Sequence, residues 1–378
     1  MSSQKSVRKQ IVVGLFAVAL VGGAVALFME RTPLLAWFYM HSLSRAAEQD
    51  RTLWVDRTAG LGEGAEPAVF ACLRQTDEGA CRNAGAVLER WTVQYGPDDA
   101  RAAALADHMG KGFGADSLAG RQVVLEMAAL WFAPTTAKPS DALASACARL
   151  VAAAAKGAEP SVHAAGLNLC SLALDRTDDA KEMLDAGRDL VLVTLRDEPA
   201  ANRVRATLLA VRPGMDDLEE VAVLLKDPVP EVRRAALLAV GPADEKVVSA
   251  KSLLPVLHDE DLEVRRACED VLRLDRHLSP QSYQIGWCLY HPDPAQRLNV
   301  LDHLRRGAGV EPGVWLRELS HDKSPAVRLA AVRVMSQQDR VDLGDRLEQM
   351  AADDPSPTVS QMARLYQKWT KPAAGVQR

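Results

Sequence analysis

Apolar residues recur at helical spacing in paired runs along most of the chain. One run places Leu218, Val221 and Leu224 three positions apart, and a later run does the same with Ala235 and Leu238. Residues three or four positions apart line one face of a helix. Short segments rich in Asp and Pro separate the runs, and proline is tolerated in a turn or in the first turn of a helix. The pattern predicts pairs of helices of about 10–14 residues, each pair joined by a tight turn.

The turns that join these helix pairs share a common sequence. Four of them align without gaps, with an Asp five residues before a Val, and in the first three an Arg follows that Val directly. These are Asp227–Arg233, Asp259–Arg265, Asp322–Arg328 and Asp354–Ser360, and His291–Arg297 fits the same frame between the second and the third. Small residues follow each Arg. A turn repeated in this way predicts a repeat protein.

Weaker copies of the turn extend upstream. Asp197–Arg203 keeps the Asp and the Arg, Gly157–His163 keeps the Val, and Arg82 and Arg121 begin comparable apolar helices. Counted at the Arg position, the last five steps are 30, 32, 32, 31 and 32 residues, and the earlier ones lie near 40. Helix pairs this short cannot bury an apolar face alone, so neighbouring pairs must stack. We therefore predict an all-α fold, a right-handed α-solenoid of stacked helix pairs.

The signature D-x-x-x-x-V-R-x-A-A resembles that of HEAT repeats, in the short bacterial form also found in HEAT-like lyases of phycobilin assembly. The resemblance is specific for regular repeats over residues 213–369 and suggestive for divergent repeats over residues 66–212. It implies that the Asp and Arg side chains form a ladder between successive repeats, with Val and Ala in the core. Gln296 in place of Val and Ser360 in place of Arg depart from the pattern. The implied ladder residues are Asp227, Arg233, Asp259, Arg265, Arg297, Asp322 and Arg328.

Residues 11–29 form an apolar run without a charge or a proline. As a helix this run spans about 28 Å, close to the ~30 Å of a hydrocarbon core. Lys5, Arg8 and Lys9 precede it, and the positive-inside tendency keeps that end in the cytoplasm. We expect a single-pass membrane anchor with the bulk of the chain outside the cytoplasm. The alternative is a signal peptide cleaved after the small residues Ala24–Ala26, which would release a soluble exported array.

The segments around these two regions complete the predicted organisation. Residues 1–10 are the cytoplasmic N-terminus of the anchored form. Residues 30–65 contain several aromatic side chains and the glycine-rich stretch Gly60–Gly64, and they predict a juxtamembrane helix followed by a flexible joint. Residues 370–378 are predicted to form a disordered tail.

Composition agrees with a helical protein and offers no catalytic motif. Aromatic residues make up 5% of the chain and Ala is abundant, which favours helices over a β-sandwich or barrel. The chain contains no G-x-S-x-G, no phosphate-binding loop and no C-x-x-C motif. No two of the eight histidines have the spacing of a metal site, and His258, His291 and His321 each end a first helix, where a cation suits the helix dipole. We expect no enzyme activity, no cofactor and no metal.

The six cysteines allow disulfides in an exported domain. Consecutive cysteines are separated by spacings that place both members of a pair on adjacent helices. The pairs would be Cys72–Cys81, Cys147–Cys170 and Cys268–Cys288. The other interpretation is that they are small core residues, since Cys268 occupies an Ala position of the signature.

The leading functional interpretation is a membrane-anchored, non-catalytic scaffold that binds a protein or peptide partner outside the cytoplasm. The second helices would line a concave face for that partner. Arg234, Arg266 and Arg297 are the first candidates for partner contacts, because an Arg beside the signature can point outward. One alternative is a HEAT-like lyase or chromophore-handling protein. The other is a nucleic-acid-binding solenoid similar to the HEAT-type alkylpurine glycosylases, but the net charge of −5 disfavours phosphate binding, so no nucleic acid is expected.

Overall fold

A computed structural model describes residues 31–177, 181–197, 199–215, 217–306, 311–336 and 343–370. Across these residues the chain forms helices and no strand, which confirms the all-α prediction. It divides into two units, unit 1 (Met1–Asp217) and unit 2 (Leu218–Arg378). The division falls in the loop between Ala210 and Leu218, where the change from divergent to regular repeats is predicted.

Two predicted segments lie outside the described residues, the membrane anchor at 11–29 and all but the first residue of the tail at 370–378. Within the described residues, every helix is too short or too polar to cross a membrane.

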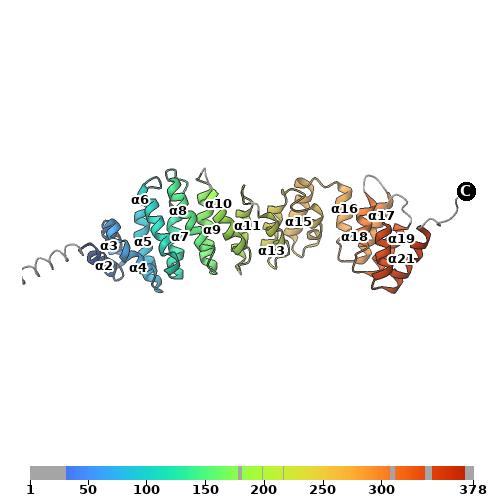
Figure 1. Ribbon diagram of the computed structural model, residues 1–378, viewed down its shortest axis with the longest axis horizontal. Coiled ribbons are helices and arrows are strands. Elements are labelled where there is room, and N and C mark those ends of the chain that lie inside the picture. Colours follow the sequence, from blue (N-terminus) through green and yellow to red (C-terminus); the bar gives the residue numbers. More distant parts are fainter. Residues whose placement is uncertain are drawn as a thin grey trace, which may run out of the picture. The chain divides into compact units, whose positions relative to one another are not determined.

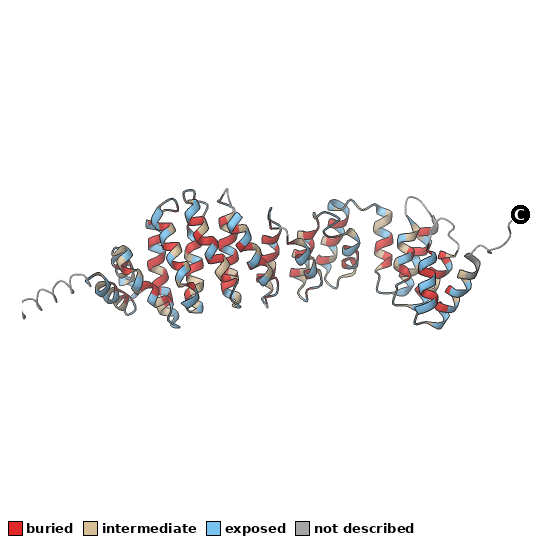
Figure 2. Cartoon of the chain, viewed as in Figure 1, coloured by how far each residue is buried: buried red, intermediate tan, exposed pale blue. Residues whose placement is uncertain are grey.

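Unit 1 is a stack of two helical layers (Figure 1). One layer runs through α3, α5, α7, α9 and α11, and the other through α6, α8 and α10, so alternate helices pack together. Figure 2 shows buried residues on the facing sides of these helices. The helices are α2 (Arg31–Leu43), α3 (Glu48–Ala59), η1 (Gly62–Ala65), α4 (Glu66–Leu73), α5 (Glu78–Gln94), α6 (Ala100–Gly112), η2 (Phe113–Ala115), α7 (Leu118–Leu130), α8 (Asp141–Ala154), α9 (Pro160–Leu174), α10 (Lys181–Thr194) and α11 (Ala200–Ala210).

The segment from residue 31 to residue 65 belongs to this stack and is not a flexible joint. Gly62 has a positive φ of 57°, which a glycine adopts at little cost, and it begins the 3₁₀ turn η1. Ala59 ends α3, and its carbonyl accepts a hydrogen bond from the indole N–H of Trp91 at 3.0 Å. Ala65 is fully buried. The predicted joint is therefore replaced by a packed turn, because the apolar sides of α2 and α3 are covered by α4 and α5.

Unit 2 repeats a shorter helix pair. Its first helices include 3₁₀ turns, and its second helices pack on one another from α13 to α15 and again from α17 through α19 to α21. The elements are α12 (Leu218–Ala222), η3 (Val223–Lys226), α13 (Pro230–Val240), α14 (Ala250–Leu253), η4 (Leu254–His258), α15 (Leu262–Asp270), η5 (Val271–Asp275), α16 (Pro280–Leu289), α17 (Pro294–Arg306), α18 (Pro312–Leu319), α19 (Pro325–Met335), α20 (Gly344–Asp353) and α21 (Pro357–Thr370).

The signature residues explain the sharp turn in each pair. A carboxylate oxygen of the turn Asp accepts a hydrogen bond from the backbone N–H two residues later, at 2.8 Å for Asp259 and 2.7 Å for Asp322. This side-chain bond replaces one that the interrupted helix cannot make. The signature Val then points into the core and is fully buried, as at Val264 and Val327, whereas Gln296 at the same position is half-buried.

Candidate functional site

Three arginines of unit 2 each hold the turn Asp of the next repeat with two parallel hydrogen bonds. In each pair Nε and Nη2 of the Arg donate to the two carboxylate oxygens, at distances between 2.6 and 2.9 Å. Planar two-point contacts of this kind are the strongest that a guanidinium makes. The pairs are Arg233–Asp259, Arg297–Asp322 and Arg328–Asp354.

The same arginines also bind their own turn. Nη1 of Arg233 donates to the carbonyl oxygen of Asp227 at 2.8 Å, so one guanidinium ties two successive turns together. Burial alone would raise the pKa of Asp259, but the hydrogen bonds from Arg233 and from the Asp261 N–H outweigh it and hold that pKa below its ordinary value. The ladder therefore consists of charged side chains whose hydrogen bonds connect successive turns.

Arg265 stands at a break in this ladder. Its Nη1 donates to the Asp259 carbonyl at 2.6 Å, as the pattern requires, but the next turn carries His291 where the others carry Asp. The imidazole copies one role of that Asp, since Nδ1 of His291 accepts the N–H of Asp293 at 3.0 Å. It offers no carboxylate, so Arg265 cannot make to the next turn the two-point contact that Arg233, Arg297 and Arg328 make.

Unit 1 makes the equivalent contacts with other side chains. Arg121 Nη1 donates to Glu159 at 3.3 Å, and His163 Nδ1 lies 2.9 Å from Asp197. The His163 ring is 1% exposed, and Nδ2 of Asn202 donates to the same Asp197 carboxylate at 2.9 Å. Positions 121 and 163 are the Arg positions of the upstream repeats, so the spacing located these contacts although the partners were not predicted.

The arginines singled out for partner contacts divide into two groups. Arg234 and Arg266 are exposed, and Arg266 pairs with Glu263 of its own helix at 2.8 Å. Arg297 does not point outward: it is 3% exposed and belongs to the ladder. The correction follows from its register, because Arg297 holds the same signature position as Arg233.

All six cysteines are free thiols in the structure, so the three disulfides that the spacing allowed are not present. The sulfurs of Cys81, Cys170 and Cys268 face backbone oxygens. Cys81 Sγ donates to the Gln75 carbonyl at 3.4 Å, and Cys268 Sγ donates to the Leu253 carbonyl at 3.4 Å. Burial raises the pKa of Cys147, and also that of Cys170 and Cys268, to about 12, which makes them unreactive core residues.

Asp116 is a buried acid whose carboxylate is left without a hydrogen-bond partner in the described part of the chain. It lies between η2 and α7, is 4% exposed, and neither carboxylate oxygen has a hydrogen-bond partner among the described residues. Burial raises its pKa to about 6, against the attraction of Arg74 and Arg121. Within the same described part of the chain, no group of three metal-ligating side chains comes together.

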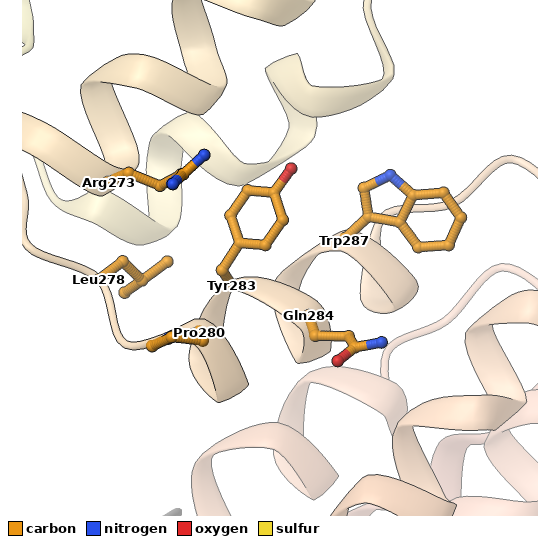
Figure 3. Close-up of a pocket in the computed structure, with 6 residues that line it drawn as sticks. All are labelled: Arg273, Leu278, Pro280, Tyr283, Gln284 and Trp287. Carbon is orange, nitrogen blue, oxygen red and sulfur yellow. The ribbon is translucent and has the colours of Figure 1, made fainter.

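A groove of about 620 Å³ lies beside α16 in unit 2 (Figure 3). Its wall combines two aromatic rings, a guanidinium, an amide and two apolar side chains. In Figure 3 the Tyr283 ring stands between Arg273 and Trp287. The lining residues are Arg273, Leu278, Pro280, Tyr283, Gln284 and Trp287.

Two histidines, His258 and His291, contact Trp287 of the groove. Nε2 of His258 donates to the Trp287 carbonyl at 2.7 Å, and the His258 and His291 rings lie 5.3 and 4.9 Å from the Trp287 ring. Burial, followed by the nearby Glu269, raises the pKa of Tyr283 to about 12, so its hydroxyl stays a neutral hydrogen-bond donor. Burial also lowers the pKa of His258. The groove therefore presents one fixed cation among neutral groups.

The backbone around the groove is irregular. The segment η5, Val271–Asp275, is a π-helical turn, and His277 has a positive φ of 49°. Such features are uncommon and cluster at functional sites. On the other side, a Cβ at Gly286 would lie 2.5 Å from a methyl group of Leu254, so α16 approaches η4 closely only because residue 286 has no side chain. Sequence reasoning missed this site, and its only signal was the interrupted signature at His291.

A second depression of about 440 Å³ lies in unit 1 beside α9 and α11. Its lining residues include no aromatic side chain; of its two arginines, Arg205 is exposed, and Arg212 is already paired with Asp175 and donates to Ser171 Oγ at 3.2 Å. We therefore regard the groove beside α16 as the candidate site.

Stacked helix pairs, with side-chain contacts between successive turns, define the class of this protein: an all-α fold of helical repeats. No protein-family model and no curated protein matches the chain. A solved structure, "Crystal Structure of Importin Beta in a Polyethylene Glycol Condition", is similar at a TM-score of 0.48 and 12% identity. The alignment covers 88% of this chain and 53% of the importin β chain, so this chain spans about half the length of that protein.

Proposed function

We propose that the protein is a membrane-anchored, non-catalytic scaffold that binds a protein partner outside the cytoplasm. The anchor in this proposal is the apolar run at residues 11–29, oriented by Lys5, Arg8 and Lys9 before it. The partner would be an unfolded or extended segment of another protein.

The groove beside α16 is the observation that carries the binding role. Trp287 and Tyr283 offer flat apolar surfaces, Gln284 offers an amide that can pair with a peptide backbone, and Arg273 can bind a carboxylate. Few, well-placed polar groups in an apolar wall are typical of a binding site. The ladder arginines are already engaged within the protein, so they are unsuited to hold a ligand.

The location is tested by protease treatment of intact spheroplasts that express the full chain, followed by carbonate extraction. We expect a carbonate-resistant band that the protease degrades. A protected band would place the repeats in the cytoplasm and overturn the extracytoplasmic assignment. Release by carbonate would instead favour the cleaved signal peptide.

The groove is tested with peptides selected from a displayed library on the purified full chain. We expect Trp287→Ala and Arg273→Ala to weaken peptide binding by at least about tenfold. Arg266→Ala is the matched control, because Arg266 is an exposed arginine in the same repeat outside the groove. Loss of binding in Arg266→Ala with retention in Arg273→Ala would move the site to the exposed arginines of the second helices.

A further inference from the structure

Helix α2 presents a second apolar face that the fold does not use. Ala36, Met40 and Leu43 are buried against the rest of unit 1. On another side of the same helix, Leu34, Trp37 and Phe38 follow one another at helical spacing and are exposed; the Trp37 side chain is 63% exposed. A helix that is apolar on two sides needs a second covering surface to remove both from water.

The exposed aromatic residues of α2 belong to two groups of ring contacts, one of which includes Trp54 of α3. The ring of Phe38 meets that of Trp54 edge to face at 6.1 Å, and Tyr39 lies 5.8 Å from the same indole. Trp37 stacks on His41 at 5.3 Å, and the Arg57 guanidinium lies 4.8 Å from the centre of the Trp54 ring. Trp and Tyr combine an apolar ring with a polar edge, which suits the boundary between lipid chains and water.

Helix α2 and the turn after it are cationic, whereas acids flank this stretch at Glu30, Glu48 and Asp50. From residue 31 to residue 47 the sequence contains Arg31, His41 and Arg45 and no Asp or Glu. Arg31 and Arg45 are exposed. Cations beside an apolar face add electrostatic attraction to the insertion of apolar side chains into an anionic membrane surface.

The position of α2 in the sequence indicates that a membrane covers this face. The apolar run at residues 11–29 ends two residues before Arg31, where α2 begins, with Glu30 between them. We propose that the aromatic face of α2 and α3 lies in the interfacial layer of the bilayer that this run enters. This inference rests on the anchor in the proposed function. It adds that unit 1 is held against the membrane by a face of its own rather than by a free tether.

The test places a photoreactive residue on this face in the full chain. Trp37→p-benzoylphenylalanine replaces one large aromatic residue by another, and the matched control is Leu208→p-benzoylphenylalanine on α11, because Leu208 is 61% exposed in the same unit. Both proteins are reconstituted into vesicles of phosphatidylcholine and phosphatidylglycerol, washed with carbonate, irradiated and analysed by mass spectrometry. We expect several-fold more lipid adducts at position 37 than at position 208.

The outcomes separate the two proposals. If carbonate releases the chain, the anchor and the inference both fail. If the chain resists carbonate but position 37 gives no more lipid adducts than position 208, only the inference fails. Adducts at position 37 to a second copy of the chain, or to residues 11–29, would show that protein covers this face and would also overturn the inference.

Discussion

The two units make the same connection between neighbouring repeats from different side chains. In unit 2, Arg297 and Asp322 meet through two parallel hydrogen bonds. In unit 1, the same place is taken by a buried imidazole beside Asp197, with Asn202 as a further donor. At these two junctions a donor after one turn meets an acceptor at the next, and different pairs of residues make this contact.

The side chains that make this contact differ in burial, so the loss of one partner should destabilise the two units to different degrees. At Arg233 and Asp259 the arginine reaches across the junction while both groups keep some contact with solvent, whereas Arg297 and Asp322 are more deeply buried. His163 is shorter and is buried together with its acid. Removal of one partner from a buried pair leaves the other without compensation, whereas a partly solvated group can turn to water.

The largest effect should come from His163→Ala. We expect the free energy of unfolding of unit 1 to fall by about 3–5 kcal/mol, because Asp197 would remain buried without its main partner. Hydrogen exchange measured by mass spectrometry on the full chain would report faster exchange in α9 and α11. His108→Ala is the control, since that ring is half exposed and pairs with Glu66 at the surface. An equal, small change in both variants would contradict the comparison.

A smaller effect is expected along the ladder of unit 2, and it should be uneven. Arg297→Ala should lower the free energy of unfolding by about 2–4 kcal/mol, because it leaves the buried Asp322 unpaired. Arg265→Ala should lower it by only about 1 kcal/mol, because Arg265 contributes hydrogen bonds to carbonyl groups alone. Denaturant melts of both variants would measure the change in the free energy of unfolding, and hydrogen exchange in α15 and α17 would locate it.

The break itself can be repaired. His291→Asp keeps an acceptor for the Asp293 N–H and gives Arg265 the carboxylate that the other arginines have. We expect a gain of about 1 kcal/mol in the wild-type background and no gain when it is combined with Arg265→Ala. Equal gains in both backgrounds would mean that the carboxylate acts without Arg265.

Another prediction concerns the pH dependence of the stability of unit 1. The folded pKa of Asp116, about 6, lies above its ordinary value of 3.8, so the protonated form is favoured in the folded protein. Its favourable contribution is complete below pH 3.8 and is lost as the pH rises through about 6. Asp116→Asn should therefore stabilise unit 1 at pH 7 by about 1–3 kcal/mol. Melts at pH 4 and pH 7 would test this, and a gain as large at pH 4 would refute the titration argument.

The smallest predicted effect has the opposite sign and lies in unit 2. Burial, together with nearby cations, lowers the pKa of His258 and of His321, so both bind a proton more readily in the unfolded chain. Their contribution is present above pH 6.5, the ordinary histidine value, and is lost as the pH falls through the folded pKa. Acidification should therefore speed hydrogen exchange around α16 and α18. In His258→Gln this acid sensitivity should be reduced around α16, and an unchanged response would assign it to other groups.

Much of the fold could be predicted from the sequence, because a repeated turn constrains every copy. The positions of Asp259, Val264 and Arg233 within the signature fixed the turn, the core and the ladder together. Arg297 was predicted both as a ladder residue and as a partner contact, and only the first prediction agrees with its register, which is that of Arg233.

The groove could not be predicted for a different reason. It depends on a π-helical turn, on the left-handed backbone at His277 and on the close approach of Gly286 to Leu254. Each is a small departure from the repeat, and none changes the spacing of the signature. Conversely, the aromatic residues before residue 40 were visible in the sequence, but the structure was needed to show which of them the fold buries.

The missing carboxylate at His291 also bears on how the array responds to force. The second helices α15 and α17 approach each other less closely than the other consecutive second helices in the described part of unit 2, and the buried cluster of the last three repeats begins only at Ile285. In a linear array each repeat is supported by its neighbours alone. Tension applied along unit 2 would therefore separate its second helices first at this joint. The mechanical compliance of unit 2 is thus concentrated beside α16, at the point where the groove opens.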